Sequence, residues 1–119
     1  MRDYTKIVAW QRATELAQSV YALAEMLPTD ERFGLSAQMK RAAVSVVSNI
    51  AEGCGRSTDQ EFEHFLSMAS GSASELRSQI ELVNILWPAV MARPTLDLAH
   101  EVKRLLWSLR EASRKSRSR

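Results

Sequence analysis

Two carboxylate–histidine pairs are the groups in this sequence that come nearest to a metal site. In each pair, Glu61 with His64 and Asp97 with His100, the side chains are three residues apart, the spacing that di-iron helical bundles use. At 100° per residue, however, each histidine points about 200° away from the apolar face of its own helix. We therefore expect both histidines to face outward, and the sequence predicts neither a metal site nor a cofactor.

A second arrangement would suit phosphodiester chemistry. Arg93 and His100 have six residues between them, a loose spacing found in certain helical ribonucleases, although Pro94 interrupts it. There, a guanidinium stabilises the scissile phosphate and an imidazole moves its proton. The single cysteine, Cys54, is far in the sequence from either histidine, which favours a packing role over a nucleophile. We expect a protein that is not an enzyme, with a ribonuclease using Arg93 and His100 as the third hypothesis.

Positive charge is concentrated at one end of the chain. Between residues 103 and 119 the only acidic residue is Glu111, whereas the rest of the chain is acidic overall. A basic, serine-rich segment suits contacts with phosphates, with an affinity that falls as salt rises. The alternative is a solvated tail that aids solubility. We predict a bundle domain over residues 1–109 and a basic tail over residues 110–119. The predicted nucleic-acid-binding residues are Lys103, Arg104, Arg110, Arg114, Lys115, Arg117 and Arg119.

The sequence predicts that all the elements that position these groups are helices. The chain has four glycines and three prolines, and no segment alternates in hydropathy as a strand would. Helices are predicted over residues 6–27, 35–53 and 59–87, and from about residue 95 into the basic tail. Ser36 is the expected cap of the second helix, and Thr58 with Glu61 forms a capping box for the third. Short connections favour an all-α, up-and-down antiparallel four-helix bundle.

The first two helices carry more apolar surface than one core requires. The third helix has one stripe, from Phe62 to Trp87, and the fourth has a narrow arc, from Leu98 to Ala112, that leaves Trp107 on the opposite side. Each of the first two helices has two stripes, and a second stripe needs a partner. We expect self-association, unless a broad core within one chain covers both stripes. The predicted interface residues are Ala9, Ala13, Leu16, Val20, Leu23, Leu27, Val44 and Val47.

Small and polar side chains mark the second and third helices. Gly71 lies in the middle of the third helix, where glycine costs about 1 kcal/mol relative to alanine. We expect close packing of its segment on residues 42–51 to offset that cost. Polar groups along the second helix must be paired wherever they are buried. A structural network is predicted, with a catalytic carboxylate or an RNA-reading amide as the alternative. Its members are Gln38, Arg41, Ser45, Asn49, Glu52, Arg56 and Glu75.

Two motifs resemble a known family. The runs GLSAQMKRAAVSVVSNIAEGCGR and EFEHFLSMASGSASEL are similar to the small four-helix-bundle proteins encoded in intervening sequences of bacterial 23S rRNA genes. The resemblance implies a bundle that assembles as a ring, typically a homopentamer. Related proteins include the accessory subunit of diversity-generating retroelements, which binds nucleic acid and a reverse transcriptase. Val47 stands where relatives often have proline, and the basic tail has no counterpart in the family pattern.

Composition places the protein among ordinary globular domains. Apolar residues make up 45% of the 119 residues, no apolar run is long enough to span a bilayer, and the first residues lack the apolar core of a signal peptide. A single cysteine fits a reducing compartment, so a cytoplasmic location is expected. The sequence predicts a non-enzymatic, oligomeric accessory protein that binds RNA or DNA. The alternative is a protein-interaction scaffold that presents Trp107 to a partner.

Overall fold

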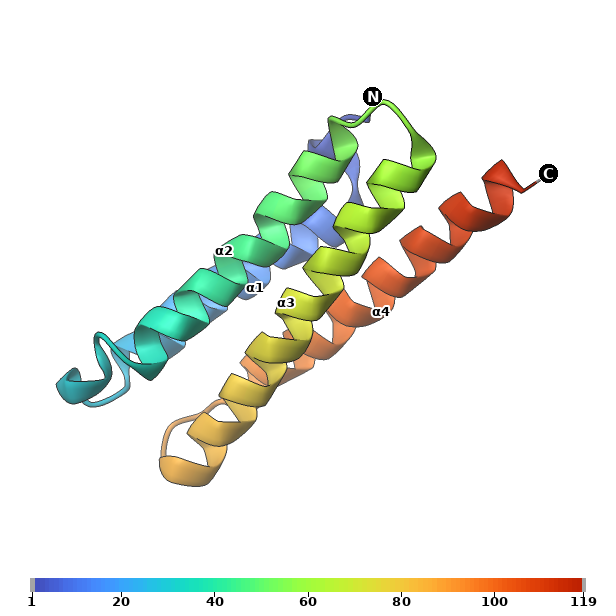
Figure 1. Cartoon of the computed structure of the whole chain (residues 1–119). Helices are drawn as coiled ribbons and strands as arrows, with labels where there is room; N and C mark the ends of the chain where they lie inside the picture. The colour runs from blue at the N-terminus through green and yellow to red at the C-terminus, as the bar shows by residue number, and fades with distance from the viewer. Residues whose placement is uncertain (1, 119) are drawn as a thin grey trace.

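Four α-helices lie side by side with alternating directions in the computed structural model, which describes residues 2–118 (Figure 1). Each helix packs against its neighbours in sequence, and the fourth closes the bundle against the first. The described residues contain no strand, which confirms the predicted all-α fold of four packed helices. The elements are η1 (Tyr4–Lys6), α1 (Val8–Glu25), η2 (Thr29–Glu31), α2 (Leu35–Cys54), α3 (Asp59–Leu86) and α4 (Arg93–Arg117).

The start of α3 follows the predicted capping box. Thr58 Oγ1 accepts a hydrogen bond from the backbone N–H of Glu61 at 3.1 Å, and its hydroxyl donates to the Glu61 carboxylate at 3.0 Å. The helix ends at Leu86, two residues before Pro88, as expected for a chain that cannot continue a helix through a proline. These boundaries are set by residues within one or two turns of each end.

Two other helix starts differ from the prediction. Ser36 does not cap α2: its side chain is buried in the first turn, and Gly34 occupies the N-cap position without a side-chain hydrogen bond. α4 begins at Arg93, two residues earlier than expected, with Pro94 inside its first turn. Proline is tolerated there because the first N–H groups of a helix have no partner within the helix.

The oligomer-interface prediction is wrong for six of its eight residues, because a broad core of the single chain covers them. The stripe of α1 that remains at the surface is the other one, with Trp10 and Ala17 half-buried and Tyr21 45% exposed. On α2, Val44 is 46% exposed and Val47 is half-buried, so these two residues keep free surface. The six core residues, each at most 8% exposed, are Ala9, Ala13, Leu16, Val20, Leu23 and Leu27.

α4 is rotated from its predicted orientation and extends further. Leu98, Leu105 and Leu109, expected at the centre of its apolar face, are only half-buried, and Ala112 is exposed. The helix also continues past residue 109 without a break as far as Arg117, so the basic segment forms its last two turns. No helix among residues 2–118 is long and apolar enough to cross a membrane. The α4 residues that fill the core are Leu96, Ala99, Val102 and Leu106.

The close approach of α2 and α3 occurs, but Gly71 does not take part in it. The two helices form the most extensive pairing in the bundle, and Ala69 and Ala73 are fully buried. Gly71 faces the opposite way, and a Cβ atom built on it would meet nothing within 4 Å. Gly53 makes the tight contact instead, since a Cβ atom there would lie 3.0 Å from the Phe65 Cβ. The prediction for Gly71 is therefore wrong.

Candidate nucleic-acid interface

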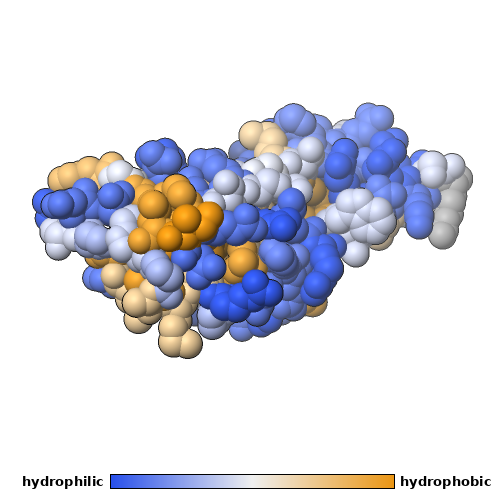
Figure 2. All heavy atoms as spheres, turned by 90° about the horizontal axis from the view of Figure 1, so that it is seen from below, coloured by the Kyte–Doolittle hydropathy of each residue, from blue (hydrophilic) through white to orange (hydrophobic). Residues whose placement is uncertain are grey.

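One face of α4 gathers most of the predicted cations around an exposed tryptophan. We call the residues Lys103, Arg104, Trp107, Arg110, Arg114 and Lys115 the basic face of α4. At 100° per residue, its five cations lie within about 80° of the direction of Trp107, and they extend over about 18 Å of helix. The end of the molecule that carries the C-terminus is covered mainly by hydrophilic residues, as Figure 2 shows. Charge and an aromatic ring thus share one surface.

The acidic residues of α4 leave this face positive. Glu101 lies outside this face, about 120° around the helix from Trp107, and Arg12 of α1 donates to it at 3.1 and 2.6 Å. These hydrogen bonds outweigh partial burial and hold the pKa of Glu101 below its usual range. Glu111 pairs with Arg114 at 3.1 Å, an exposed contact of little strength. Neither carboxylate prevents a phosphate from approaching the basic face.

The cations of the basic face differ in their hydrogen bonds and in their exposure to solvent. Lys103 donates to the Ser74 hydroxyl of α3 at 2.7 Å, which ties the basic face to the neighbouring helix. The Arg110 Nε is buried and has no hydrogen-bond partner among the described residues. Arg104 and Lys115 are exposed. Arg104, Arg114 and Lys115 therefore remain the most accessible cations for an anion from outside.

Arg117 is not available in the same way, because it forms an ion pair with Glu63 of α3. Its Nε donates to both carboxylate oxygens of Glu63, at 3.0 and 2.9 Å, and the Ser113 hydroxyl donates to the same carboxylate at 2.7 Å. Burial disfavours the charged form of Glu63, but these hydrogen bonds outweigh it and lower the pKa of Glu63. The pair holds the end of α4 against the bundle. Arg119 lies outside the described residues.

We expect Glu63→Gln to make folding stability less dependent on pH in the acidic range. Because the pKa of Glu63 is lowered in the folded state, its stabilisation is present above the unfolded-state pKa and is lost as pH falls through the folded-state pKa. The loss at neutral pH should be about 1 kcal/mol, since Arg117 is 36% exposed and solvent screens it. Urea unfolding at neutral and acidic pH measures both effects.

The control for this experiment is Glu25→Gln, which removes an exposed carboxylate at the other end of the bundle. It should leave the free energy of unfolding nearly unchanged at both pH values. An equal acid dependence in the wild type and in Glu63→Gln would show that the ion pair does not stabilise the fold.

The predicted polar network forms only in part, and it lies along the surface seam between α2 and α3. The Asn49 amide donates to the Ser45 backbone carbonyl at 2.9 Å and to its hydroxyl at 3.1 Å, and the Ser45 hydroxyl bonds the Ser72 hydroxyl at 2.8 Å. Ser72 was not predicted. Gln38 and Arg41 are exposed, so they do not need partners within the chain.

The remaining members of that network form two short-range pairs. Arg56 donates to Glu52 four residues earlier at 3.0 Å, and Gln79 donates to Glu75 at 3.1 Å. Gln79 and Ser72 were not predicted as members of the network. The sequence does not show which neighbouring helix a polar residue at the edge of a helix will face.

The residues considered for catalysis do not converge on one another. Arg93 lies in the first turn of α4, 3.3 Å from Asp97, whereas His100 is two turns further on and its Nε2 is buried without a hydrogen-bond partner among the described residues. His64 is exposed on the outside of α3, as expected, but the same expectation is wrong for His100, which is half-buried. Cys54 is 1% exposed, and burial raises the pKa of its thiol, which makes it a poor nucleophile.

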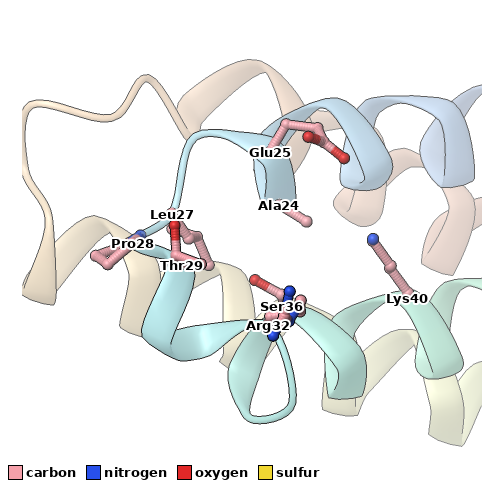
Figure 3. Close-up of a pocket in the computed structure, with 8 residues that line it drawn as sticks. All are labelled: Ala24, Glu25, Leu27, Pro28, Thr29, Arg32, Ser36 and Lys40. Atoms are coloured by element: carbon pink, nitrogen blue, oxygen red, sulfur yellow. The ribbon is translucent and has the colours of Figure 1, made fainter.

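A cavity lies elsewhere, where α1 ends and α2 begins (Figure 3). It holds about 220 Å³, and its side chains come from both helices and the short segment between them. Arg32 and Lys40 are opposed there by Glu25, so the cavity has no single charge. It shares no residue with the basic face of α4.

Fold and surface together define a small four-helix-bundle protein with a basic helix face. The family model for 23S rRNA-intervening sequence proteins matches residues 5–108, and the chain belongs to this family. The match includes Lys103, Arg104 and Trp107, whereas the last basic residues lie beyond it. No curated protein matches the chain significantly.

Proposed function

We propose that this protein binds nucleic acid, through the basic face of α4, as a non-enzymatic accessory protein. The observation that carries the proposal is the accessibility of Arg104, Arg114 and Lys115 on one face of a helix otherwise fixed to the bundle. Exposed cations on one face of a helix can contact several phosphates of a nucleic acid at once. A family named for 23S rRNA intervening sequences makes RNA the first ligand to test.

Neutralising the three accessible cations together tests this proposal better than removing the basic segment. Residues 110–117 belong to α4, and Arg117 secures α3, so a truncation would also disturb the fold. We expect Arg104→Gln with Arg114→Gln and Lys115→Gln to reduce the salt slope of RNA binding by about 2–3 in log–log form. Fluorescence anisotropy with a structured RNA and with duplex DNA, across a salt series, gives this slope.

A matched control removes three exposed cations from other parts of the molecule. Lys6→Gln, Arg32→Gln and Arg93→Gln change the net charge equally and leave the basic face intact. This variant should keep the slope of the wild type. Equal slopes for both triple variants would assign binding to net charge alone, and the absence of salt-sensitive binding in the wild type would overturn the proposal.

Self-association is a further part of the proposed function. Apolar residues border the seam between α1 and α2 on the outside of the bundle, where Lys40 lies 5.1 Å from the centre of the Tyr21 ring. A strip of this kind favours burial against another copy. We propose that copies assemble through it into a ring, for which a homopentamer is the expected form. The residues of this α1–α2 strip are Trp10, Ala17, Tyr21, Val44, Val47 and Ala51.

A protein-interaction scaffold is the second candidate function. Hydrophobic residues gather near the end that carries the α3–α4 connection, as Figure 2 shows, and Leu82, Ile85, Leu86 and Met91 are between 42% and 78% exposed. A reverse transcriptase is one protein partner to test. Copurification of a protein from nuclease-treated material, without salt-sensitive nucleic-acid binding, would favour this candidate over the first.

A further inference from the structure

Trp107 is a large aromatic side chain that the bundle does not use. It is 63% exposed, whereas Trp10 and Trp87 are half-buried against the core. Trp10 also packs against Tyr4, with ring centroids 5.1 Å apart. A single exposed aromatic side chain is common on protein surfaces, so what Trp107 can bind has to be argued from the groups around it.

The surroundings of Trp107 are cationic. Lys103 and Arg104 precede it by one turn, and Arg110 and Arg114 follow it by one and two turns on the same face. An open groove runs beside the ring along α4, lined by Ser108, Glu111, Ala112 and Lys115 among others. Glu111 is the one carboxylate in this lining, and Arg114 pairs with it at 3.1 Å. A ligand that fits must therefore present a flat apolar surface together with negative charge.

The neighbouring helix leaves room beside this face. Lys103 is linked to Ser74 of α3 at 2.7 Å, so the two helices are in contact at this point. One turn before Ser74, the outward side of α3 carries Gly71, where a side chain would meet nothing within 4 Å. A ligand that extends from Trp107 toward α3 would therefore meet Ser74 and the open space at Gly71.

We infer that Trp107 stacks against an unpaired base, which makes the basic face of α4 a site for single-stranded nucleic acid. This inference rests on the proposed function and narrows it to one ligand class. The flanking cations suit the phosphates on either side of the stacked base, because aromatic stacking and phosphate contacts together characterise single-strand binding. Within a duplex, both faces of each base are already stacked, so the ring gains nothing from it.

The test compares Trp107→Ala with Trp107→Phe on two probes of the same sequence. The probes are an adenine-rich RNA strand of about ten nucleotides and its duplex with the complementary strand. We expect Trp107→Ala to weaken single-strand binding by about 5- to 150-fold, the range for one lost stacking contact, and duplex binding by less than about twofold. Trp107→Phe should retain part of the single-strand affinity.

Phe33→Ala is the matched control, because Phe33 is an 84% exposed aromatic residue whose ring lies 4.6 Å from the Arg32 guanidinium at the other end of the bundle. It should leave both affinities unchanged. A DNA strand of the same sequence shows whether the site distinguishes RNA from DNA, and stacking predicts binding of both. Circular dichroism should show that Trp107→Ala keeps the helical content of the wild type.

Three results would overturn the inference, and they can be told apart. If the wild type binds with a salt-dependent affinity and Trp107→Ala weakens both probes equally, the proposed function stands and the stacking site is wrong. If the wild type binds neither probe at any salt concentration, the proposed function fails and the inference fails with it. Capture of a protein that depends on Trp107, without nucleic-acid binding, would assign the ring to a protein contact.

Discussion

Alanine in place of Gly53 should lower the free energy of unfolding by about 1–2 kcal/mol, although alanine is the better helix former. The added Cβ would lie 3.0 Å from the Phe65 Cβ and 3.3 Å from the Phe62 carbonyl oxygen. Both atoms belong to or adjoin the α3 backbone and cannot move alone, so the two helices must separate. The strain outweighs the gain in helix propensity, which is about 1 kcal/mol. Urea unfolding followed by circular dichroism measures the change.

Gly71→Ala provides the control, because it makes the same chemical change at a helical position with open space around it. It should raise the free energy of unfolding by about 0.5–1 kcal/mol. The two variants thus separate the backbone preference, which they share, from close packing, which only Gly53 experiences. Equal and positive effects at both sites would show that α2 and α3 do not approach as closely as Gly53 indicates.

Val44→Glu should reduce the oligomer that we propose to a particle of one chain, about 13.4 kDa. Val44 is 46% exposed in the α1–α2 strip, so a carboxylate there remains solvated in the single chain and costs little stability. In the proposed assembly the same carboxylate would be buried against an apolar surface without a partner, which is strongly unfavourable. Multi-angle light scattering after size exclusion gives the mass of each particle.

Val8→Glu is the control for this prediction. Val8 is a 55% exposed valine on α1 outside the α1–α2 strip, so the substitution changes charge and size equally. It should leave the mass of the particle unchanged. A wild-type particle of one chain would contradict the proposed self-association, and loss of mass in Val8→Glu but not in Val44→Glu would place the interface elsewhere.

The sequence predicted α3 more accurately than the other helices. Its buried residues form one stripe that contains most of its large apolar side chains, so one orientation covers that stripe, although Leu82, Ile85 and Leu86 near its end stay exposed. Its start is encoded by Thr58 and its end by Pro88, both of which act on the nearest backbone groups. A local cause within one turn can be read from the residues themselves.

For α1 and α4, the pattern of apolar residues did not determine which face of the helix is buried. α1 has two apolar stripes of the same period, and the position of its neighbours determines which one enters the core. In α4 the sequence predicts an arc from Leu98 to Ala112, but of that arc only Val102 is buried, and Leu96, Ala99 and Leu106 fill the core beside it. Periodicity shows how apolar residues cluster around one helix. It does not show where the neighbouring helices lie or how close they are.

In the candidate site, too, one part could be predicted from the sequence and another part depends on how the helices pack. The order of the residues was enough to locate the cations near the end of the chain, because the charge of each side chain follows from its residue type. That Arg117 is held by a carboxylate 54 residues away, while Arg104 and Lys115 stay exposed, depends on how α3 and α4 lie against each other. Trp107 was identified from the sequence as left over from the core, but its place among the cations needed α4 to continue unbroken to Arg117.

The sequence by itself determined the number of helices, the core face of α3, the family and the end of the chain that is basic. Each of these depends on residue type or on spacing within a helix. Helix geometry alone fixes which residues share a face, so no contact with another helix is needed. Only the tertiary structure decided which stripe of α1 is buried, which glycine permits the close approach and which cations remain accessible. These depend on contacts between residues far apart in the chain, and such contacts exist only once the helices have packed.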